Sequence, residues 1–65
     1  MFQIKDRLKK LGKTQVWLIF ELRKRGIDIQ PPLMSSIING VYTYPQANRI
    51  LVVCDEILKK VENDA

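Results

Sequence analysis

The fold of this chain is decided by residues 14–40, which read TQVWLIFELRKRGIDIQPPLMSSIING. The first part predicts a helix over residues 14–25, because the Thr14 hydroxyl can cap a helix and an apolar run follows it. Gly26 can adopt the left-handed conformation that ends a helix, and cations in the preceding turn suit the negative end of the helix dipole. These cations are Arg23, Lys24 and Arg25. The apolar run predicts that this helix is buried on more than one side.

The rest of the stretch predicts a second helix over residues 31–39. Gln30 stands at the cap position, and Pro31 and Pro32 set the angle of a first turn without needing amide donors that lack partners there. Asn39 and the glycine after it close the helix. Apolar residues three and four apart can face inward, which leaves an uncharged outer face. The inward residues are Leu33, Met34, Ile37 and Ile38, and the outer ridge consists of Gln30, Pro31, Pro32, Ser35, Ser36 and Asn39.

Helices are also predicted on both sides of this stretch. Residues 2–11 place apolar side chains on one stripe and cations on the other. Apolar positions recur at helical spacing from Ala47 onward, after a capping box at Thr43 and Gln46. These signals predict a terminal helix over about residues 44–61. The 65-residue chain is therefore predicted to be a single domain, a compact all-α fold of four helices with a long C-terminal helix.

Three apolar side chains outside this framework each have more than one interpretation. Trp17 either covers the small core or presents an aromatic plane at an interface. Cys54 lies in the apolar stripe of the terminal helix, as a small core residue or as a reactive thiol. Val52 points almost opposite that stripe, with Val53 at its edge, and is either an ordinary exposed residue or the seed of a dimer contact.

The length and composition exclude several classes of function. The core of a 65-residue chain is too small to shelter an ordinary substrate cleft, which favours a binding module over an enzyme. The chain contains no His and one Cys, which argues against the usual metal sites, a serine triad and an intramolecular disulfide. We therefore expect no enzymatic activity, no cofactor, no metal and no small-molecule substrate.

The same composition indicates a cytoplasmic protein. A lone thiol fits a reducing compartment. No apolar run approaches the roughly 20 residues that a membrane span requires, and the charges throughout residues 1–11 are unlike a secretory signal. We expect no membrane partner.

The charge is unevenly shared between the two parts of the chain. Residues 1–27 contain eight lysines and arginines against two acids, a net charge of +6, and residues 28–65 contain three against five, a net charge of −2. Such a bias is expected when one side approaches a polyanion, because cations that neutralise phosphates release counterions. The alternative is a solvated surface that happens to be rich in lysine.

Residues 14–40 resemble the DNA-binding domain of the Cro and lambda-repressor-like phage regulators, a helix-turn-helix family also called the XRE type. That family opens its second helix with Thr-Gln, has Leu three residues after the Gln, and ends its recognition helix with Ile-Ser-x-Ile-x-Asn-Gly before a Pro. The matching elements here are Thr14-Gln15, Leu18, the run MSSIING at 34–40, and Pro45. The resemblance covers roughly residues 1–50 and implies a helix-turn-helix over about 14–40.

The resemblance also implies which residues contact DNA. Gln15 would contact the backbone or an edge base, and Asn39 matches a phosphate-contacting position. The first turn of a helix inserted in the major groove lies nearest the base edges. The candidates for base reading are Gln30, Pro31, Pro32, Ser35 and Ser36. The candidates for phosphate contact are Lys13, Gln15, Arg23, Lys24, Arg25, Asn39 and Tyr42, although Tyr42 could instead cover the core. We expect the outer ridge to be exposed beside Arg23, Lys24 and Arg25.

Three departures from the family pattern affect this hypothesis. The segment between Thr14 and Gly26 is three residues longer than usual, which adds phosphate contacts or changes how the helices cross. Pro31 and Pro32 replace polar side chains and cannot make the bidentate bonds that discriminate bases by about 1–3 kcal/mol each. A single terminal helix replaces the family's final pair, with no attached dimerisation domain. A monomer would read one half-site, which suggests a homodimer or a partner regulator.

We therefore expect a sequence-specific, repressor-like DNA-binding regulator of transcription, derived from a phage or mobile element. The competing hypothesis is an interaction module, such as an anti-repressor or adaptor, that keeps the fold but has lost base reading. It is motivated by the two prolines and by apolar side chains at Trp17, Val52 and Val53.

Overall fold

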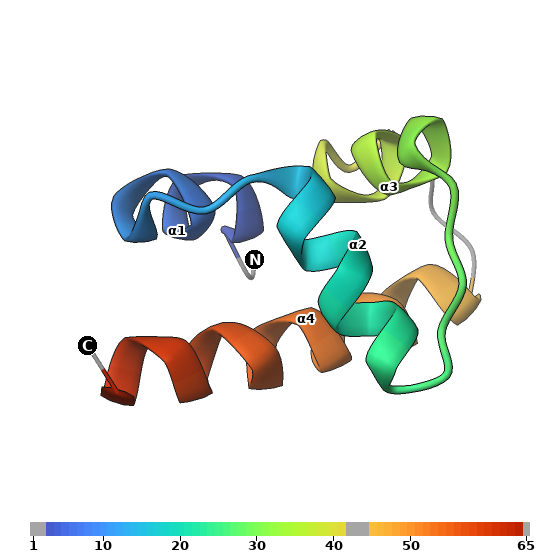
Figure 1. Cartoon of the computed structure of the whole chain (residues 1–65). Helices are drawn as coiled ribbons and strands as arrows, with labels where there is room; N and C mark the ends of the chain where they lie inside the picture. Colours follow the sequence, from blue (N-terminus) through green and yellow to red (C-terminus); the bar gives the residue numbers. More distant parts are fainter. Residues whose placement is uncertain (1–2, 42–44, 65) are drawn as a thin grey trace.

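The computed structural model describes residues 3–41 and 45–64, and within these it shows four helices around one core (Figure 1). The helices are α1 (Ile4–Leu11), α2 (Gln15–Lys24), α3 (Pro31–Ile38) and α4 (Pro45–Asp64). The described residues contain no strand. The prediction of an all-α fold with four helices and a long terminal helix is confirmed.

The predicted ends of α2 are present in the structure. The Thr14 hydroxyl accepts a hydrogen bond from the backbone N–H of Trp17 at 3.1 Å, which satisfies one of the unpaired amides of the first turn. Gly26 has a φ of 85°, and the amide of Ile27 donates to the carbonyl of Leu22 at 3.0 Å. A positive φ at this position is easily adopted only by glycine, so the stop signal acts through backbone freedom.

α3 begins at Pro31 and turns its predicted apolar residues inward. Gln30 precedes it with an extended backbone, but the Gln30 side chain makes no capping hydrogen bond. Met34 and Ile37 are fully buried. The inward face of this helix is therefore confirmed, and its other two members, Leu33 and Ile38, are half-buried against the core.

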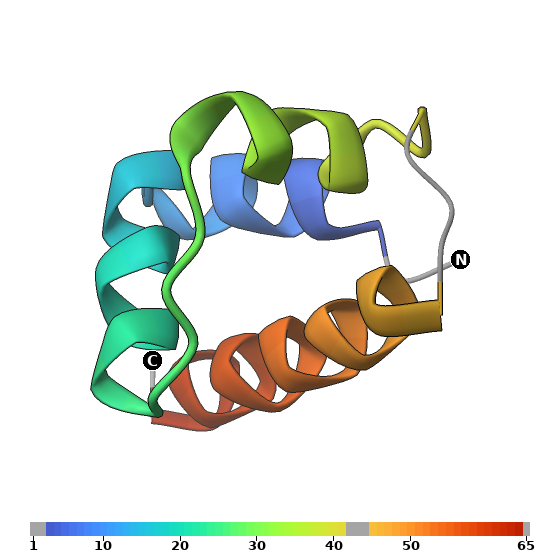
Figure 2. The same ribbon diagram turned by 90° about the vertical axis from the view of Figure 1, so that its right-hand side faces the viewer.

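The four helices enclose the core from different sides (Figure 2). α3 and α4 lie on opposite sides of the molecule in this view, and α2 spans the distance between them along one edge. α4 packs against each of the other three helices. The largest fully buried side chains come from α2, α3 and α4: Leu18, Leu22, Met34, Ile37, Leu58 and Cys54. Cys54 is therefore a core residue, and burial raises the pKa of its thiol to about 12.

α2 differs from the prediction in its burial. Its inner side chains Leu18, Ile19 and Leu22 are buried, but Val16 is 57% exposed and Phe20 is 52% exposed. The prediction of burial on more than one side is therefore wrong. The reason is tertiary: α2 lies along one edge of the described molecule, and the other helices cover one of its sides (Figure 2).

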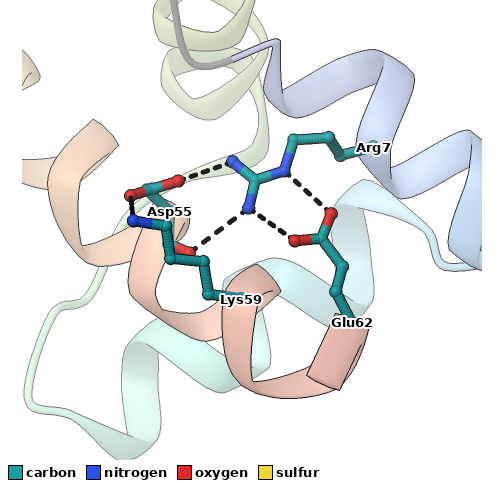
Figure 3. A network of polar contacts seen from close by, with 4 residues as sticks. All are labelled: Arg7, Asp55, Lys59 and Glu62. Carbon is teal, nitrogen blue, oxygen red and sulfur yellow. Dashed lines mark hydrogen bonds and ion pairs between the residues drawn. The ribbon is translucent and has the colours of Figure 1, made fainter. Parts of the chain in front are cut away.

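An ion-pair network joins α1 to α4 (Figure 3). The Arg7 guanidinium donates from Nη1 to Oδ1 of Asp55 at 2.7 Å, and from Nε and Nη2 to the carboxylate of Glu62 at 3.0 and 2.9 Å. Lys59 adds a contact to Asp55 at 3.2 Å. These bonds hold the pKa of both carboxyls below their ordinary values. Glu62 lies past the predicted end near residue 61, and α4 continues to Asp64.

Candidate nucleic-acid interface

A groove of about 490 Å³ lies where α1, the start of α2 and the end of α3 meet. Three lysines line it, and we call it the basic groove. Its polar lining consists of Lys5, Lys9, Lys13, Gln15, Ser35, Asn39 and Asp6. It therefore brings together four of the predicted DNA-contacting residues from two sequence segments: Lys13, Gln15, Ser35 and Asn39.

Local structure explains how these side chains converge. Lys5 and Lys9 are four residues apart on α1 and so share a face of the helix. The amide of Lys13 donates to the carbonyl of Leu8 at 2.9 Å, which turns the chain at the end of α1 and directs it into α2. The Thr14 cap then makes Gln15 the first residue of α2, beside the end of α3.

The lysines of the basic groove have no carboxylate partner in the described part of the chain. No acid of residues 3–41 and 45–64 forms an ion pair with Lys5, Lys9 or Lys13. The Lys13 ammonium lies 5.3 Å from the centroid of the Trp17 ring. Asp6 is the one acid among the described residues lining the groove. The groove is therefore net positive, and its lysines are available to an external anion.

The outer ridge runs along α3 next to this groove. Gln30, Pro31, Pro32 and Asn39 are exposed, and Ser35 and Ser36 are half-buried. The Ser36 hydroxyl donates to the Pro32 carbonyl at 3.1 Å, and the Asn39 amide donates to the Ser35 hydroxyl at 3.3 Å. The serines therefore have partners close by in α3, whereas Gln30 is an exposed polar side chain at the start of the ridge, followed by two prolines.

The α2 C-terminal cluster of Arg23, Lys24 and Arg25 is in a different environment. Each cation has an acidic neighbour: Arg23 lies 3.6 Å from Asp28, Lys24 lies 2.8 Å from Glu21, and Arg25 lies 4.0 Å from Glu56. The cluster stands at the end of α2 remote from α3 (Figure 1).

The expected exposure of the ridge is therefore found at four of its six residues, but its expected position beside the cluster is not. The ten residues of α2 span about 15 Å, so its two ends reach different parts of the molecule. Residues 26–30 run back across the molecule to α3 (Figure 2). Of the predicted phosphate contacts, Lys13, Gln15 and Asn39 line the basic groove. Arg23, Lys24 and Arg25 lie instead at the far end of α2. Tyr42, the remaining candidate, lies outside the described residues.

Lys5 and Lys9 were missed as site residues by the sequence analysis, which counted them only in the charge of residues 1–27. Their spacing of four residues on the polar side of α1 was the available signal. Only the tertiary arrangement, which brings α1, the start of α2 and the end of α3 around one groove, turns that polar side into a groove wall.

Comparison with protein-family models, with curated proteins and with solved structures finds no match to this chain. Within residues 3–41 and 45–64, no helix combines the length and the apolar composition needed to cross a membrane. Ammonium groups that have no carboxylate partner among the described residues, beside two side-chain amides, can bind the oxygens of phosphate groups.

Proposed function

We propose that this chain is a DNA-binding regulator of transcription that approaches the duplex with the basic groove and the outer ridge. The strongest support is that one groove is lined by three lysines and two side-chain amides. These residues are Lys5, Lys9, Lys13, Gln15 and Asn39. The resemblance of residues 14–40 to the Cro and lambda-repressor-like regulators supports it independently.

The two surfaces have different roles in this proposal. The lysines of the basic groove contact phosphates, which contribute affinity without reading sequence. The ridge enters the major groove, where Gln30 makes the hydrogen bonds to base edges and Pro31 and Pro32 pack on thymine methyl groups. Sequence preference is then modest at each position, and a second copy or a partner regulator on the same DNA supplies the rest.

The Arg23, Lys24 and Arg25 cluster has a minor part. Its cations already have acidic neighbours, so each must exchange an existing ion pair for a phosphate. Three phosphate contacts from the groove predict that log K falls with log salt with a slope of about −2.7. A slope near twice that value would show that the cluster contacts phosphates as well.

Fluorescence anisotropy with a labelled duplex, measured over a range of salt concentrations, tests this proposal. Replacing Lys5 and Lys9 by Gln should make the slope shallower by roughly two units, because two phosphate contacts are lost. Lys60→Gln is the matched control, since Lys60 is an exposed lysine of α4 outside the basic groove. If the duplex affinity of the wild-type protein did not depend on salt concentration, the proposal would be contradicted.

The competing function, an interaction module that has lost base reading, keeps part of its original motivation. Trp17 and Val53 are half-buried against the core, whereas Val52 is 40% exposed. If that function holds, a charge at Val52 abolishes function while Arg23→Ala with Lys24→Ala leaves it intact. The DNA-binding proposal predicts that a charge at Val52 leaves duplex affinity unchanged.

A further inference from the structure

The outer face of α2 carries an apolar surface that no described part of the molecule covers. Val16 and Phe20 lie one helical turn apart and are 57% and 52% exposed. Trp17 lies between them in the sequence and is half-buried. Single exposed apolar residues are common, but two exposed ones beside a half-buried aromatic residue, within five positions of one helix, form a patch. We call these three residues the α2 apolar patch.

Two of the three patch residues, Val16 and Phe20, contribute little to holding the fold together. α2 packs through Leu18, Ile19 and Leu22, which are buried on the other side of the helix. Val16 and Phe20 leave more than half of their surface in water, where polar side chains would serve the monomer equally well. Their apolar character is therefore explained better by an external partner than by packing within the chain.

The patch is bordered by cations at both ends. The Lys13 ammonium lies 5.3 Å from the centroid of the Trp17 ring, and the Arg23 guanidinium lies 5.5 Å from the centroid of the Phe20 ring. Arg23 also contacts Asp28, but at 3.6 Å and with both side chains largely exposed. Such a pair is easily exchanged for a carboxylate from another molecule. The charge that complements this surface is negative.

The patch and the basic groove lie on different sides of α2. Gln15 faces the groove, and Phe20 comes five residues later, which is about 140° around the helix axis. Figure 2 shows α2 along one edge of the described molecule. A protein bound to the patch would share Lys13 with the basic groove and would leave the other groove residues and the outer ridge accessible.

We propose that the α2 apolar patch binds an acidic amphipathic helix of a partner protein. Two packed helices lie about 8–10 Å apart, close enough for an apolar stripe to cover Val16, Trp17 and Phe20. Lys13 lies two residues before α2 begins, and Arg23 lies in its last turn, so the two cations flank the patch. The partner helix accordingly carries carboxylates toward both ends of its apolar stripe.

A second copy of the chain fits this description poorly. Of the acids of α4, Asp55 and Glu62 already bind Arg7, and Glu56 lies 4.0 Å from Arg25. Val52, the exposed apolar residue of α4, stands in the same helix as Arg49, Lys59 and Lys60, so its surroundings are not uniformly acidic. The complementary helix is therefore assigned to another protein.

The test uses a synthetic helical peptide titrated into the full isotope-labelled chain and followed by amide chemical shifts. Its leucines are spaced three and four apart, and glutamates flank the stripe at both ends. Shifts are expected to centre on Val16, Trp17 and Phe20. A second peptide with lysine in place of glutamate should bind at least about tenfold more weakly, because Lys13 and Arg23 would then repel it.

Phe20→Ser should weaken binding of the acidic peptide by about tenfold or more, since an aromatic side chain at the centre of a small interface dominates its affinity. Val52→Ser is the matched control and should leave binding unchanged. Duplex binding by Phe20→Ser should equal that of the wild type, which also shows that the variant is folded. This measurement separates failure of the present proposal from failure of DNA binding.

Three results would overturn the proposal. One is equal binding of the acidic and basic peptides, or no binding of either. Another is a set of shifts centred away from α2, or unaltered binding by Phe20→Ser. The third is a wild-type dimer in sedimentation that Phe20→Ser converts to a monomer, which would assign the patch to a second copy of this chain.

Discussion

The basic groove and the cluster at the end of α2 contain similar numbers of cations but differ in what surrounds them. Lys5, Lys9 and Lys13 have no acidic partner among the described residues, whereas Arg23, Lys24 and Arg25 each have one. In the sequence, all six cations contribute equally to the net charge of +6 of residues 1–27, which results from eight cations and two acids. The difference shows that net charge locates a basic surface only after the acids contributed by other segments have been taken into account.

The largest effect is expected from removing all three lysines of the groove. Replacing Lys5, Lys9 and Lys13 by Gln should lower duplex affinity by roughly two orders of magnitude at low salt, because three phosphate contacts are lost. Anisotropy titration measures this, with circular dichroism as a check on folding. All three side chains lie at the surface of α1 or in the turn after it, so the helix content should be unchanged. If duplex affinity fell by less than about threefold, the basic groove would not be the main phosphate-binding surface.

The next effect concerns the support of the groove rather than its charges. Arg7→Gln removes the link from α1 to Asp55 and Glu62, and α1 carries two of the groove lysines. We expect the melting temperature to fall by several degrees and duplex affinity to fall with it. Lys10→Gln is the control, since it removes a cation from the same helix outside this network. Unchanged melting of Arg7→Gln would show that the network does not hold α1 in place.

The same network predicts a dependence of stability on pH. Arg7 lowers the pKa of Asp55 and Glu62 in the folded chain from ordinary values of 3.8 and 4.5. The stability they contribute is therefore complete above those ordinary values and is lost as the pH falls through the lowered ones. Urea unfolding at a series of acidic pH values should show a steep loss for the wild type. Arg7→Gln should lose less over the same range, and parallel curves would contradict this account.

The smallest effect is expected at the other end of α2. Replacing Arg23 and Lys24 by Gln should change duplex affinity by less than about threefold, because exposed cations that already have acidic partners gain little from a phosphate. The same anisotropy titration measures it. If this pair instead matched the triple lysine variant, the cluster rather than the groove would be the main phosphate-binding surface.

Much of the local structure could be predicted because its causes lie close together in the sequence. Thr14 caps α2 through an amide three residues away, and Gly26 ends it through its own backbone freedom. Met34 and Ile37 are buried because helical periodicity places them on one face. Cys54 follows the same logic on α4.

The candidate site was predicted only in part. Lys13, Gln15, Ser35 and Asn39 were selected from the sequence and do share a groove. Lys5 and Lys9 were not selected, and the Arg23, Lys24 and Arg25 cluster was expected beside a ridge from which it is separated. Both errors concern which segment lies next to which, and local spacing contains no information on that.

The sequence by itself determined where the helices begin and end and which side of α3 is apolar, since these depend on contacts within a few residues. The tertiary structure alone decided that Arg7 meets acids 48 and 55 residues away, that one side of α2 stays uncovered, and that α1 lysines meet the end of α3. The physical reason is that periodicity states which face of a helix avoids water, whereas the fitting together of all four helices decides what covers that face.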